Sequence, residues 1–453
     1  MKIIDTIDCF IPGDWGNETL SEEAPCKVSC IRGADIVPIE NNDFSHIPTR
    51  YISQQSFDTK CLQAGDIIVE KSGGSPTQST GRVSYVSQEL IDSVGSVVCS
   101  NFCVAFRVKQ NWNPLYIYYY LQHVYNNGVF FNFEGKTSGI KNLQLEAAYN
   151  AVPIEDVNKT TQDSIVAVLD SIQKKMTINR QINQNLEAFA KQLYDYWFVQ
   201  FDFPNEEDKP YKSSGGAMAW NEALKRNIPK GWHCGNLFEI AKFTNGLACQ
   251  KFRPKAGETP LPVIKIREMR DGFTADTEEV TPNIPDSVKV FNGDILFSWS
   301  ASLEVMLWAF GEGGLNQHIF KVTSANGFPK SFYYYQLLDY VDVFKKMAEA
   351  RKTTMGHITQ DHLQQSTIAI PDDKKIADEF EKRISPIFEQ MVKLQEEILA
   401  LTKQRNELLP LLMKGQVSLN SDLSSFLLYY RVPNKSENNE REHHSGDSYG
   451  NAA

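Results

Sequence analysis

The sequence lacks several features that would place it in common protein classes. It has no apolar run near the roughly 18 residues of a membrane-spanning helix, which disfavours a helical membrane protein. Its first ten residues contain acids and no continuous apolar segment, so we expect no secretory signal peptide. General disorder is excluded, because 42% of the residues are hydrophobic and 11% are aromatic. A length of 453 residues predicts about three domains.

Cysteine is sparse, with eight residues in the chain, and six of them lie within the first 103 positions. In a long chain without an export signal, this usage predicts a reduced, cytoplasmic protein. Cys26/Cys30 and Cys99/Cys103 leave a zinc site as the alternative. Their spacing differs from the usual two intervening residues, and their flanks are typical of strands, where cysteine acts as a small apolar residue. We therefore expect no metal.

Signatures of catalysis are also missing. The sequence has no phosphate loop of the type GxxxxGK[ST], no GxGxxG turn and no HExxH helix. The Asn-Pro-Pro-aromatic box of adenine methyltransferases is absent, since Asn113-Pro114 continues with Leu115. Asp66 with Glu70-Lys71 weakly resembles a metal nuclease triad, but adjacent Glu and Lys would face opposite sides of a strand. We therefore expect neither catalysis nor a cofactor.

Charge is unevenly distributed along the chain. The net charge of −10 weakly disfavours a nucleic-acid partner. Residues 1–158 hold 11 basic and 18 acidic residues, whereas residues 235–370 hold 14 and 15. The second region is therefore nearly neutral, and its basic residues are clustered.

The chain contains one long internal repeat. Gly65-Asp66-Ile67-Ile68 recurs as Gly293-Asp294-Ile295-Leu296, and the run from Tyr116 to Leu121 recurs from Phe332 to Leu337. The offset exceeds 200 residues, which is far too long for a solenoid. We interpret the repeat as two homologous halves. The contiguous tyrosines favour a core role over base stacking.

Each half ends in a long helical pattern. Positions at alternating intervals of four and three run from Ile165 to Trp197 and from Phe380 to Leu412, and all are apolar except Asn179, Asn183 and Arg405, which predicts a coiled-coil seam. Asn179 and Asn183 occupy seam positions, where polar residues fix the register. Pro386 predicts a kink or the true start of the second helix. Two unrelated amphipathic helices are the alternative. The predicted seam residues are Ile165, Leu169, Ile172, Met176, Asn179, Asn183, Leu186, Leu193, Ile387, Met391, Leu394, Ile398, Leu401 and Leu408.

Two loops after predicted strands carry donors suited to phosphate oxygens and base edges. The first begins at Lys71 and offers cations, hydroxyls and open backbone N–H groups. The second begins at Ser298 and is followed by Asn316-Gln317, whose side chains can bond adenine. Ordinary surface loops and strand-end packing are the alternatives. The candidate contacts are Lys71, Ser72, Gly73, Gly74, Ser75, Thr77, Gln78, Arg82, Ser298, Ser300, Ser302, Asn316, Gln317 and His318.

Clustered cations near these loops add candidate phosphate contacts. A solvated charged face is the alternative for any one cluster. The cations chosen are Lys136, Lys141, Arg267, Arg270, Arg351 and Lys352.

Four stretches together resemble the specificity subunit of type I restriction-modification systems. They are GDIIVEKSGGSPTQSTGRV (65–83), LEAFAKQLYDYWFVQFDFPNEEDKPYKSSGG (186–216), IPKGWHCGNLFEI (228–240) and LTKQRNELLPLLMKGQV (401–417). The resemblance implies an α+β fold with two globular target recognition domains, separated by two long antiparallel helices that form a coiled coil. Each domain would read one half of a bipartite DNA site, and the helices would set the spacing.

The resemblance also implies the domain boundaries and the partners. The partners would be double-stranded DNA, two methyltransferase subunits and, through the complex, restriction/translocase subunits, with no membrane. The expected segments are a first recognition domain at 1–158, a central helix at 159–201, a linker at 202–232, a second recognition domain at 233–371, a C-terminal helix at 372–417 and a partly disordered tail at 418–453.

Two other classes of function compete with this interpretation. A coiled-coil scaffold that never touches DNA would need the helices and not the loops. A stand-alone restriction or modification enzyme is disfavoured by the missing motifs.

Overall fold

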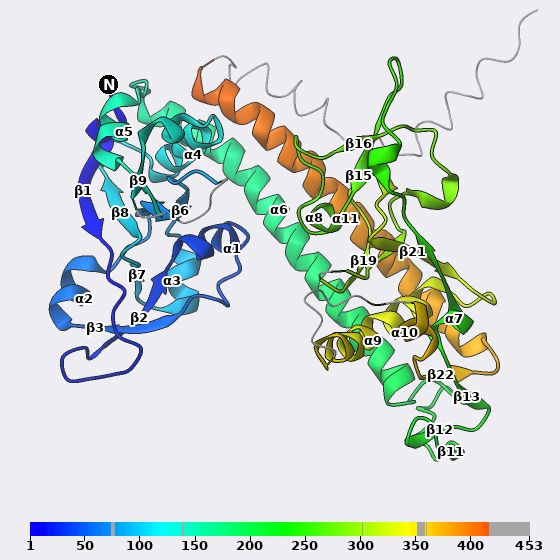
Figure 1. Ribbon diagram of the computed structural model, residues 1–453. Helices are drawn as coiled ribbons and strands as arrows, with labels where there is room; N and C mark the ends of the chain where they lie inside the picture. The colour runs from blue at the N-terminus through cyan, green and yellow to red at the C-terminus, as the bar shows by residue number, and fades with distance from the viewer. Residues whose placement is uncertain (74–77, 138–139, 301, 351–357, 359, 416–453) are drawn as a thin grey trace, which may run out of the picture. The chain divides into compact units, whose positions relative to one another are not determined.

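The structure is a computed structural model that describes residues 1–73, 78–137, 140–300, 302–350, 358 and 360–415 (Figure 1). Its contacts divide the chain into two compact units. Unit 1 comprises Met1–Ile178 and the described residues from Ala400 onward, and unit 2 comprises Asn179–Leu399. Both divisions fall inside long helices, so α6 (Lys159–Tyr194) and α11 (Lys375–Met413) each contribute to both units.

Unit 1 is an α+β body with three sheets. The largest is antiparallel with the order β1-β8-β4-β6, a second has the order β3-β2-β7 with β2 and β7 parallel, and a third has the order β5-β10-β9. Its elements are η1 (Ile3–Thr6), β1 (Ile7–Pro12), β2 (Cys26–Ile31), η2 (Gly33–Asp35), α1 (Ile36–Glu40), β3 (Thr49–Ile52), α2 (Gln54–Lys60), β4 (Ile67–Glu70), β5 (Ser72–Gly73), β6 (Val83–Tyr85), α3 (Gln88–Val94), β7 (Val97–Cys99), β8 (Cys103–Val108), α4 (Pro114–Asn126), η3 (Val129–Phe133), β9 (Glu134–Thr137), β10 (Ile140–Leu143) and α5 (Leu145–Ala151).

Unit 2 has a related architecture. One antiparallel sheet has the order β14-β21-β18-β19, and another has the order β16-β15-β20-β17 with β15 and β20 parallel. Its elements are η4 (Asp195–Val199), β11 (Met218–Asn221), β12 (Arg226–Pro229), β13 (Trp232–Gly235), α7 (Leu237–Ile240), β14 (Ala241–Asn245), η5 (Cys249–Lys251), β15 (Leu261–Ile264), α8 (Ile266–Asp271), β16 (Glu279–Val280), η6 (Asp286–Val288), β17 (Lys289–Val290), β18 (Ile295–Ser298), β19 (Glu304–Leu307), β20 (Gly313–Leu315), β21 (Ile319–Ser324), α9 (Lys330–Ala350), α10 (Gln360–Gln364) and β22 (Ile368–Pro371).

The two halves of the sequence repeat fold alike. Strand β4 lies between β8 and β6, and β18 lies between β21 and β19. Both strands follow a glycine at positive φ, +98° at Gly65 and +89° at Gly293, where a side chain would be strained. The next residue, Asp66 or Asp294, accepts a 2.8 Å hydrogen bond from a backbone N–H three positions earlier. The repeated tetrapeptide is thus one turn that starts the same central strand twice.

The tyrosine runs lie in the cores, as the sequence predicts. On α4, Tyr118 and Tyr119 are buried, and on α9 the same holds for Tyr333, Tyr334 and Tyr335. Burial raises the pKa of Tyr116 to about 12. These rings pack each half's helix onto its sheets, so they are not available to stack on a base.

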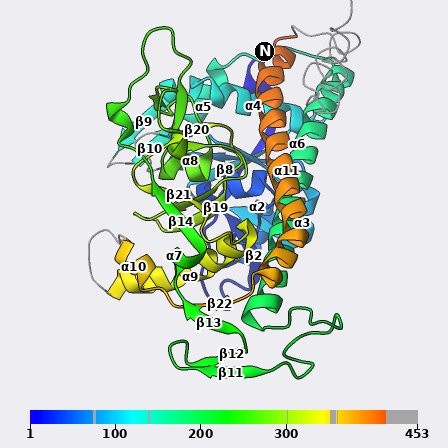
Figure 2. The ribbon, with the colours of Figure 1, turned by 90° about the vertical axis from the view of Figure 1, so that its right-hand side faces the viewer.

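The long helices pair in opposite directions inside each unit (Figures 1 and 2). In unit 1 the Arg405 guanidinium donates to Gln173 at 3.0 Å, and Thr402 lies 4.0 Å from the sulfur of Met176. In unit 2 Asn179 donates to Glu397 at 2.8 Å. Ascending positions on α6 therefore meet descending positions on α11, which is an antiparallel pair.

Two expectations about helix ends and linkers change. Helix α11 begins at Lys375 and continues through Pro386, so this proline does not mark the start of the helix. The segment expected as a linker (202–232) is packed, because Phe203, Ile228 and Trp232 are buried in the core of unit 2. The expected tail at 418–453 lies outside the described residues. Among the described helices, none is both long and apolar enough to cross a lipid bilayer.

Candidate functional site

The two units build the same backbone crossing at the end of their central strands. In unit 1 the backbone N–H of Lys71, just after β4, donates to the carbonyl of Phe102 at 2.9 Å. In unit 2 the N–H of Trp299, just after β18, donates to the carbonyl of His318 at 3.2 Å. The crossing turn is 100–102 between β7 and β8 in one unit, and 316–318 between β20 and β21 in the other. Two equivalent sites therefore carry different side chains.

An ion pair closes the first candidate loop at its base. The Arg82 guanidinium donates to both oxygens of Glu70, with distances of 2.8 and 2.7 Å. Both side chains are largely buried, 15% exposed for Arg82 and 8% for Glu70. The hydrogen bonds to Glu70 raise the pKa of Arg82 further above its usual value. The geometry thus gives Arg82 a positioning role for the loop, with the two ends of the loop clamped together.

The remaining residues of this loop split into exposed and buried groups. Lys71 is exposed and makes no ion pair within the part of the chain that the structure describes. Ser72 is buried and donates to the Asn142 carbonyl oxygen Oδ1 at 2.5 Å. Gly73 lies in the short strand β5. Gly74, Ser75 and Thr77 lie outside the described residues.

A buried carboxylate organises the far side of the loop. Glu134 accepts from the backbone N–H of Thr80 at 2.6 Å and from the hydroxyl of Ser79 at 2.9 Å. Lys141 donates to the carbonyl of Gln78 at 3.1 Å and lies 3.6 Å from Glu134. Burial raises the pKa of Glu134, but these hydrogen bonds outweigh burial and the pKa is lowered. Gln78 itself is exposed, and Lys136 belongs to β9, with its side chain outside the described part.

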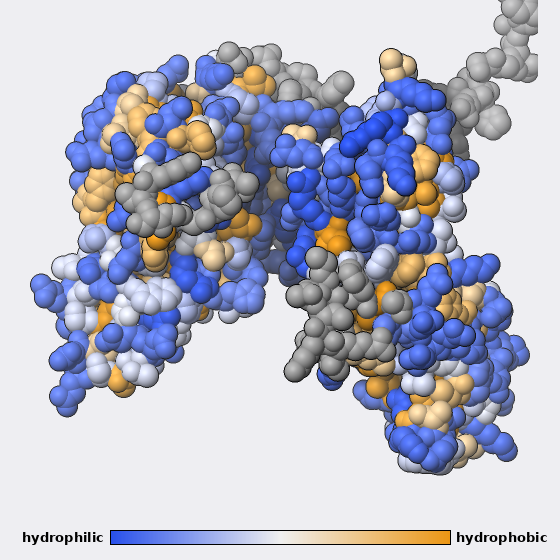
Figure 3. Space-filling model, in the orientation of Figure 1, coloured by the Kyte–Doolittle hydropathy of each residue, from blue (hydrophilic) through white to orange (hydrophobic). Residues whose placement is uncertain are grey.

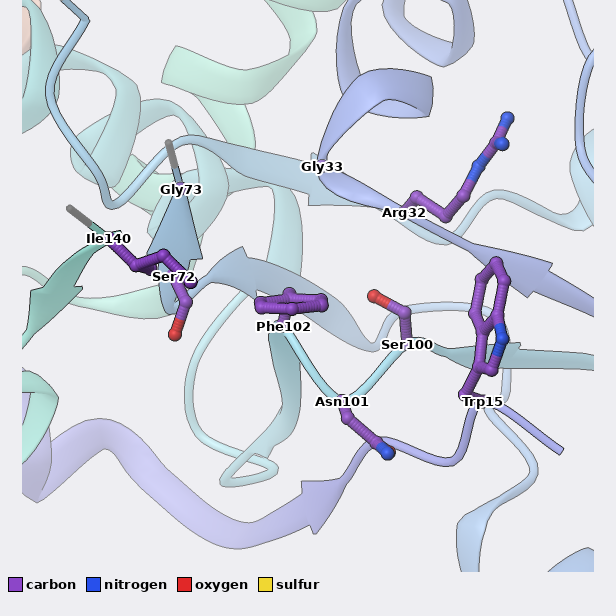
Figure 4. A pocket seen from close by; sticks show the side chains of 9 residues that line it. All are labelled: Trp15, Arg32, Gly33, Ser72, Gly73, Ser100, Asn101, Phe102 and Ile140. Atoms are coloured by element: carbon purple, nitrogen blue, oxygen red, sulfur yellow. The ribbon is translucent and has the colours of Figure 1, made fainter. Parts of the chain in front are cut away.

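Unit 1 also contains a pocket that the sequence did not reveal (Figure 4). Its volume is about 550 Å³. Aromatic rings, an amide and a guanidinium line it beside the bare backbone of two glycines. The lining residues are Trp15, Arg32, Gly33, Ser72, Gly73, Ser100, Asn101, Phe102 and Ile140. Sequence reasoning missed Asn101 and Phe102, because the matching residues of the other half, Gln317 and His318, are of different types and the repeat is not recognisable at these positions.

The second unit places polar side chains at the matching position. Ser298 is buried, donates to the carbonyl of Ser302 and accepts from the N–H of Glu304 at 3.1 Å. Ser300 and Asn316 are buried next to this strand end. The His318 ring lies 5.5 Å from the Trp299 ring, and Gln317 is 3.4 Å from the His318 nitrogen Nε2. The structure therefore brings together all the candidates from 298 to 318.

The candidate arginines of unit 2 are engaged in ion pairs. Arg267 contacts Glu268 at 2.6 Å, and Glu268 is buried. Arg270 contacts Glu304, and this pair is more exposed, 54% for Arg270 and 37% for Glu304. Arg351 and Lys352 lie outside the described residues. The cation clusters of this unit are thus partly neutralised by their own carboxylates.

Neither a nuclease triad nor a zinc site forms at the residues considered above. Asp66 is buried and accepts two 2.8 Å hydrogen bonds from Arg107, and Glu70 is held by Arg82. Burial raises the pKa of the Cys30 thiol to about 12. Across the described residues, no cluster of His, Cys, Asp and Glu could hold a metal ion.

The predicted seam residues divide between the two units. Ile165, Leu169, Ile172, Met176 and Leu408 are buried in the core of unit 1, and Leu401 packs against that core. In unit 2, Leu394 and Ile398 are buried, while Leu193, Ile387 and Met391 pack against the core; Leu186 is half-buried. Asn179 is fully buried, and Asn183 donates to the carbonyl of Met391 at 3.3 Å. The seam is therefore continuous with each unit's core.

A second apolar stripe on α6 and η4 faces outward. Ile182, Phe189 and Tyr196 recur at seven-residue intervals, which places them on one face, and they are 39%, 55% and 37% exposed. The face of each unit that is visible in Figure 3 is largely hydrophilic, with separate hydrophobic patches. A contiguous exposed apolar surface can serve as a contact surface. The same seven-residue interval in the sequence could have revealed it.

Comparisons with known proteins give consistent matches. The chain matches the family described as "Type I restriction modification DNA specificity domain" over residues 35–188 and 229–409. It is 23% identical over 437 residues to the type I restriction enzyme MjaIX specificity subunit of Methanocaldococcus jannaschii, covering 90% of this chain and 94% of that protein. The HindI specificity subunit of Haemophilus influenzae is 22% identical over 439 residues, covering 83% and 92%.

Among solved structures, the S subunit of a type I restriction-modification system from M. genitalium has a similar fold. The alignment has a TM-score of 0.51 at 14% identity and covers 91% of this chain and 95% of that one.

Proposed function

This chain belongs to the type I restriction modification DNA specificity domain family, and from that premise we propose that it is the DNA sequence-specificity subunit of a type I restriction-modification complex. Each unit reads one half of a bipartite DNA site. The paired helices α6 and α11 set the gap between the half-sites and dock methyltransferase subunits. The chain itself is not catalytic, because methyl transfer and cleavage belong to the partner subunits.

One observation carries this proposal. The same strand-end crossing occurs once in each unit, with Lys71, Asn101 and Phe102 in one and Trp299, Gln317 and His318 in the other. A common scaffold with different polar and aromatic side chains is what two readers of different half-sites require, because base edges are distinguished by their donors and acceptors. A scaffold protein without DNA recognition has no need for this duplication.

The partners follow from the surfaces and from the relatives. The chain is similar to proteins named as specificity subunits of type I restriction enzymes. On that basis its partners are double-stranded DNA, two methyltransferase subunits and, through the complex, restriction/translocase subunits. The outward stripe of Ile182, Phe189 and Tyr196 offers a methyltransferase subunit an apolar surface on the helix pair. The protein acts in the cytoplasm, where the DNA of a bacterial or archaeal host lies.

Methylome sequencing tests the function directly. The chain is expressed with its methyltransferase subunits in a host without other DNA methylation. We expect N6-methyladenine at a two-part sequence with a fixed gap. Mobility shifts with the purified complex then use duplexes with either half-site scrambled or the gap altered. Equal affinity for all duplexes and no methylated motif would favour the scaffold alternative and refute the proposal.

The helix stripe is tested separately. Phe189→Glu places a charge in the middle of the stripe, and we expect at least a tenfold loss of affinity for the methyltransferase subunit. Gln184→Glu is the matched control, because it adds the same charge at an exposed residue of α6 that lies off the stripe. Equal assembly of both variants in size-exclusion chromatography would show that the stripe is not the docking surface.

A further inference from the structure

We propose that the pocket of unit 1 receives one nucleobase turned out of the DNA duplex, which stacks on Phe102 and is read at its edge by Asn101. The proposal rests on the proposed DNA-reading function and adds a specific mode of reading to it. It concerns unit 1 alone.

The concave shape of the pocket argues for an extruded base. Base edges of an intact duplex lie at the floor of its grooves, where only protruding parts of a protein reach them. A hollow on the reading side of a protein can be filled only by a group that protrudes from the DNA. The volume of about 550 Å³ lies within the range of pockets that hold small ligands, and a flipped base is such a ligand.

The aromatic walls suit a flat ring. Phe102 is 55% exposed although it is large and apolar, and it lines the pocket together with Trp15 (Figure 4). The guanidinium of Arg50 lies 4.0 Å from the centre of the Trp15 ring and holds the indole in place. Proteins bind unstacked bases by stacking them on such rings.

Two polar side chains of the lining, Asn101 and Arg32, can bind the edge and the backbone of a nucleotide. Asn101 is exposed, and its amide makes no hydrogen bond within the described part of the chain. Asparagine can both donate to and accept from a base edge. Arg32 is fixed by Asp35, at 2.9 and 2.8 Å, and by the carbonyl of His46 at 2.9 Å. Its third nitrogen, Nη1, makes no hydrogen bond within the described residues, and we assign to it the phosphate of the extruded nucleotide.

One part of the pocket wall is bare glycine backbone. A Cβ atom on Gly33 would lie 2.5 Å from the Glu70 carboxylate, and one on Gly73 would lie 3.3 Å from it. The carboxylate that pairs with Arg82 thus occupies the space behind bare backbone. A side chain at Gly33 would therefore have to displace this carboxylate, and one at Gly73 would press against it.

Unit 2 lacks one of these walls. The N–H of Asp14 donates to the carbonyl of Cys99 at 2.7 Å, and the N–H of Leu247 donates to that of Leu315 at 2.8 Å. Cys99 ends β7 and Leu315 ends the corresponding strand β20, so the two hydrogen bonds are equivalent. The next residues along the chain, Trp15 and Ala248, therefore occupy matching positions. The proposal is therefore asymmetric: only the half-site read by unit 1 loses a base from its stack.

The test uses the whole complex and a panel of duplexes. Once the methylome defines the site, each base of the unit 1 half-site is in turn placed opposite an abasic position. Extrusion then no longer costs a base pair, so we expect one position at which binding tightens roughly ten- to hundredfold. The methylated adenine is left out of the comparison, because methyltransferases extrude their own target base.

Variants tie that position to the pocket. We expect Phe102→Leu and Asn101→Ala each to reduce the gain to about threefold or less. Phe10→Leu is the matched control, since Phe10 is also an exposed phenylalanine of unit 1 but does not line the pocket, and its gain should persist. Circular dichroism melting checks that the variants fold.

The outcomes separate the two proposals. Site-specific binding without any such gain overturns the extruded base and leaves the proposed function standing. A gain that survives Phe102→Leu also overturns it, because the base then goes elsewhere. If Phe102→Leu prevents assembly with the methyltransferase subunits in the absence of DNA, the pocket holds a protein and the inference is wrong. Absence of any sequence preference refutes both proposals.

Discussion

Replacing Arg82 by alanine is the change with the most clearly defined consequence for unit 1. The substitution removes two hydrogen bonds from a carboxylate that is only 8% exposed. Removing one partner of a buried ion pair costs about 3–5 kcal/mol, because a buried charge is left uncompensated. Since Arg82 is itself 15% exposed, water can partly replace it, and we expect a loss of roughly 2–4 kcal/mol in the free energy of unfolding.

The assay compares Arg82→Ala with Arg270→Ala. Arg270 also binds a glutamate, Glu304, but that pair is largely exposed and should be worth about 0–1 kcal/mol. In a domain of 150–250 residues, 1 kcal/mol shifts the melting temperature by about 2–4 °C. Arg82→Ala should therefore lower the melting temperature of unit 1 by roughly 4–16 °C, and Arg270→Ala should lower that of unit 2 by about 4 °C or less. Hydrogen exchange assigns each loss to its unit.

Binding supplies the second readout for Arg82→Ala. The loop that it clamps lies in unit 1, so affinity should fall for duplexes that test one half-site and should stay unchanged for duplexes that test only the other. Equal melting shifts in the two variants would refute the argument that burial makes the Glu70 pair strong. Unchanged affinity for every duplex would refute the role of the loop in reading DNA.

Three further changes test the helices and unit 2. One heptad inserted into α6 and one into α11 adds about 10.5 Å, so the methylated motif should gain a gap of about three base pairs, and an unchanged gap would exclude the ruler. Asn179→Ala removes the bond to Glu397 from a fully buried position and should cost about 1–2 kcal/mol in urea unfolding; no loss would contradict a structural role. Burial lowers the pKa of His233, but hydrogen bonds to Asp372 and Glu239 outweigh it and the pKa is raised. The stabilisation of unit 2 by protonated His233 is complete below the unfolded pKa of about 6.5 and is lost as pH rises through the folded pKa, so unit 2 should lose stability across that window. His233→Gln should flatten the dependence of the unfolding free energy on pH, and the same dependence in both proteins would contradict the role of His233.

Local signals predicted much of the fold. The repeated Gly-Asp tetrapeptide marks β4 and β18 because a positive-φ glycine and a carboxylate acceptor are needed at the start of each strand. The tyrosine runs predicted core helices correctly, since contiguous aromatics beside leucine rarely stay exposed. These features depend on neighbours in the sequence.

Long-range contacts account for what the sequence did not reveal. Arg82 looked free for DNA in its Gly- and Ser-rich loop, and its partner Glu70 is recognisable only once β4 and β6 are paired. Pro386 was expected to kink α11 or to mark its start, yet the helix begins at Lys375 and continues through the proline, where Phe380, Ile384 and Phe388 bury the surrounding turns. Asn101 and Phe102 emerge as candidates only from strand register, which aligns them with Gln317 and His318.

The ion pairing of the candidate cations bears on which subunits of the proposed complex recognise bases and which contact phosphates. Of the candidate cations, Arg82, Arg267 and Arg270 are engaged by their own glutamates, while Lys71 is exposed. Each phosphate contact contributes about 0.9 to the slope of log affinity against log salt, so arginines held by their own glutamates add less to this general attraction than free cations would. The chain's polar and aromatic side chains can still discriminate between bases, since that depends on donors, acceptors and stacking. On the proposed function, these side chains select the sequence, and the partner subunits can supply further phosphate contacts. A net charge of −10 is compatible with that division, whereas it weakly disfavours a protein that binds DNA alone through its phosphates.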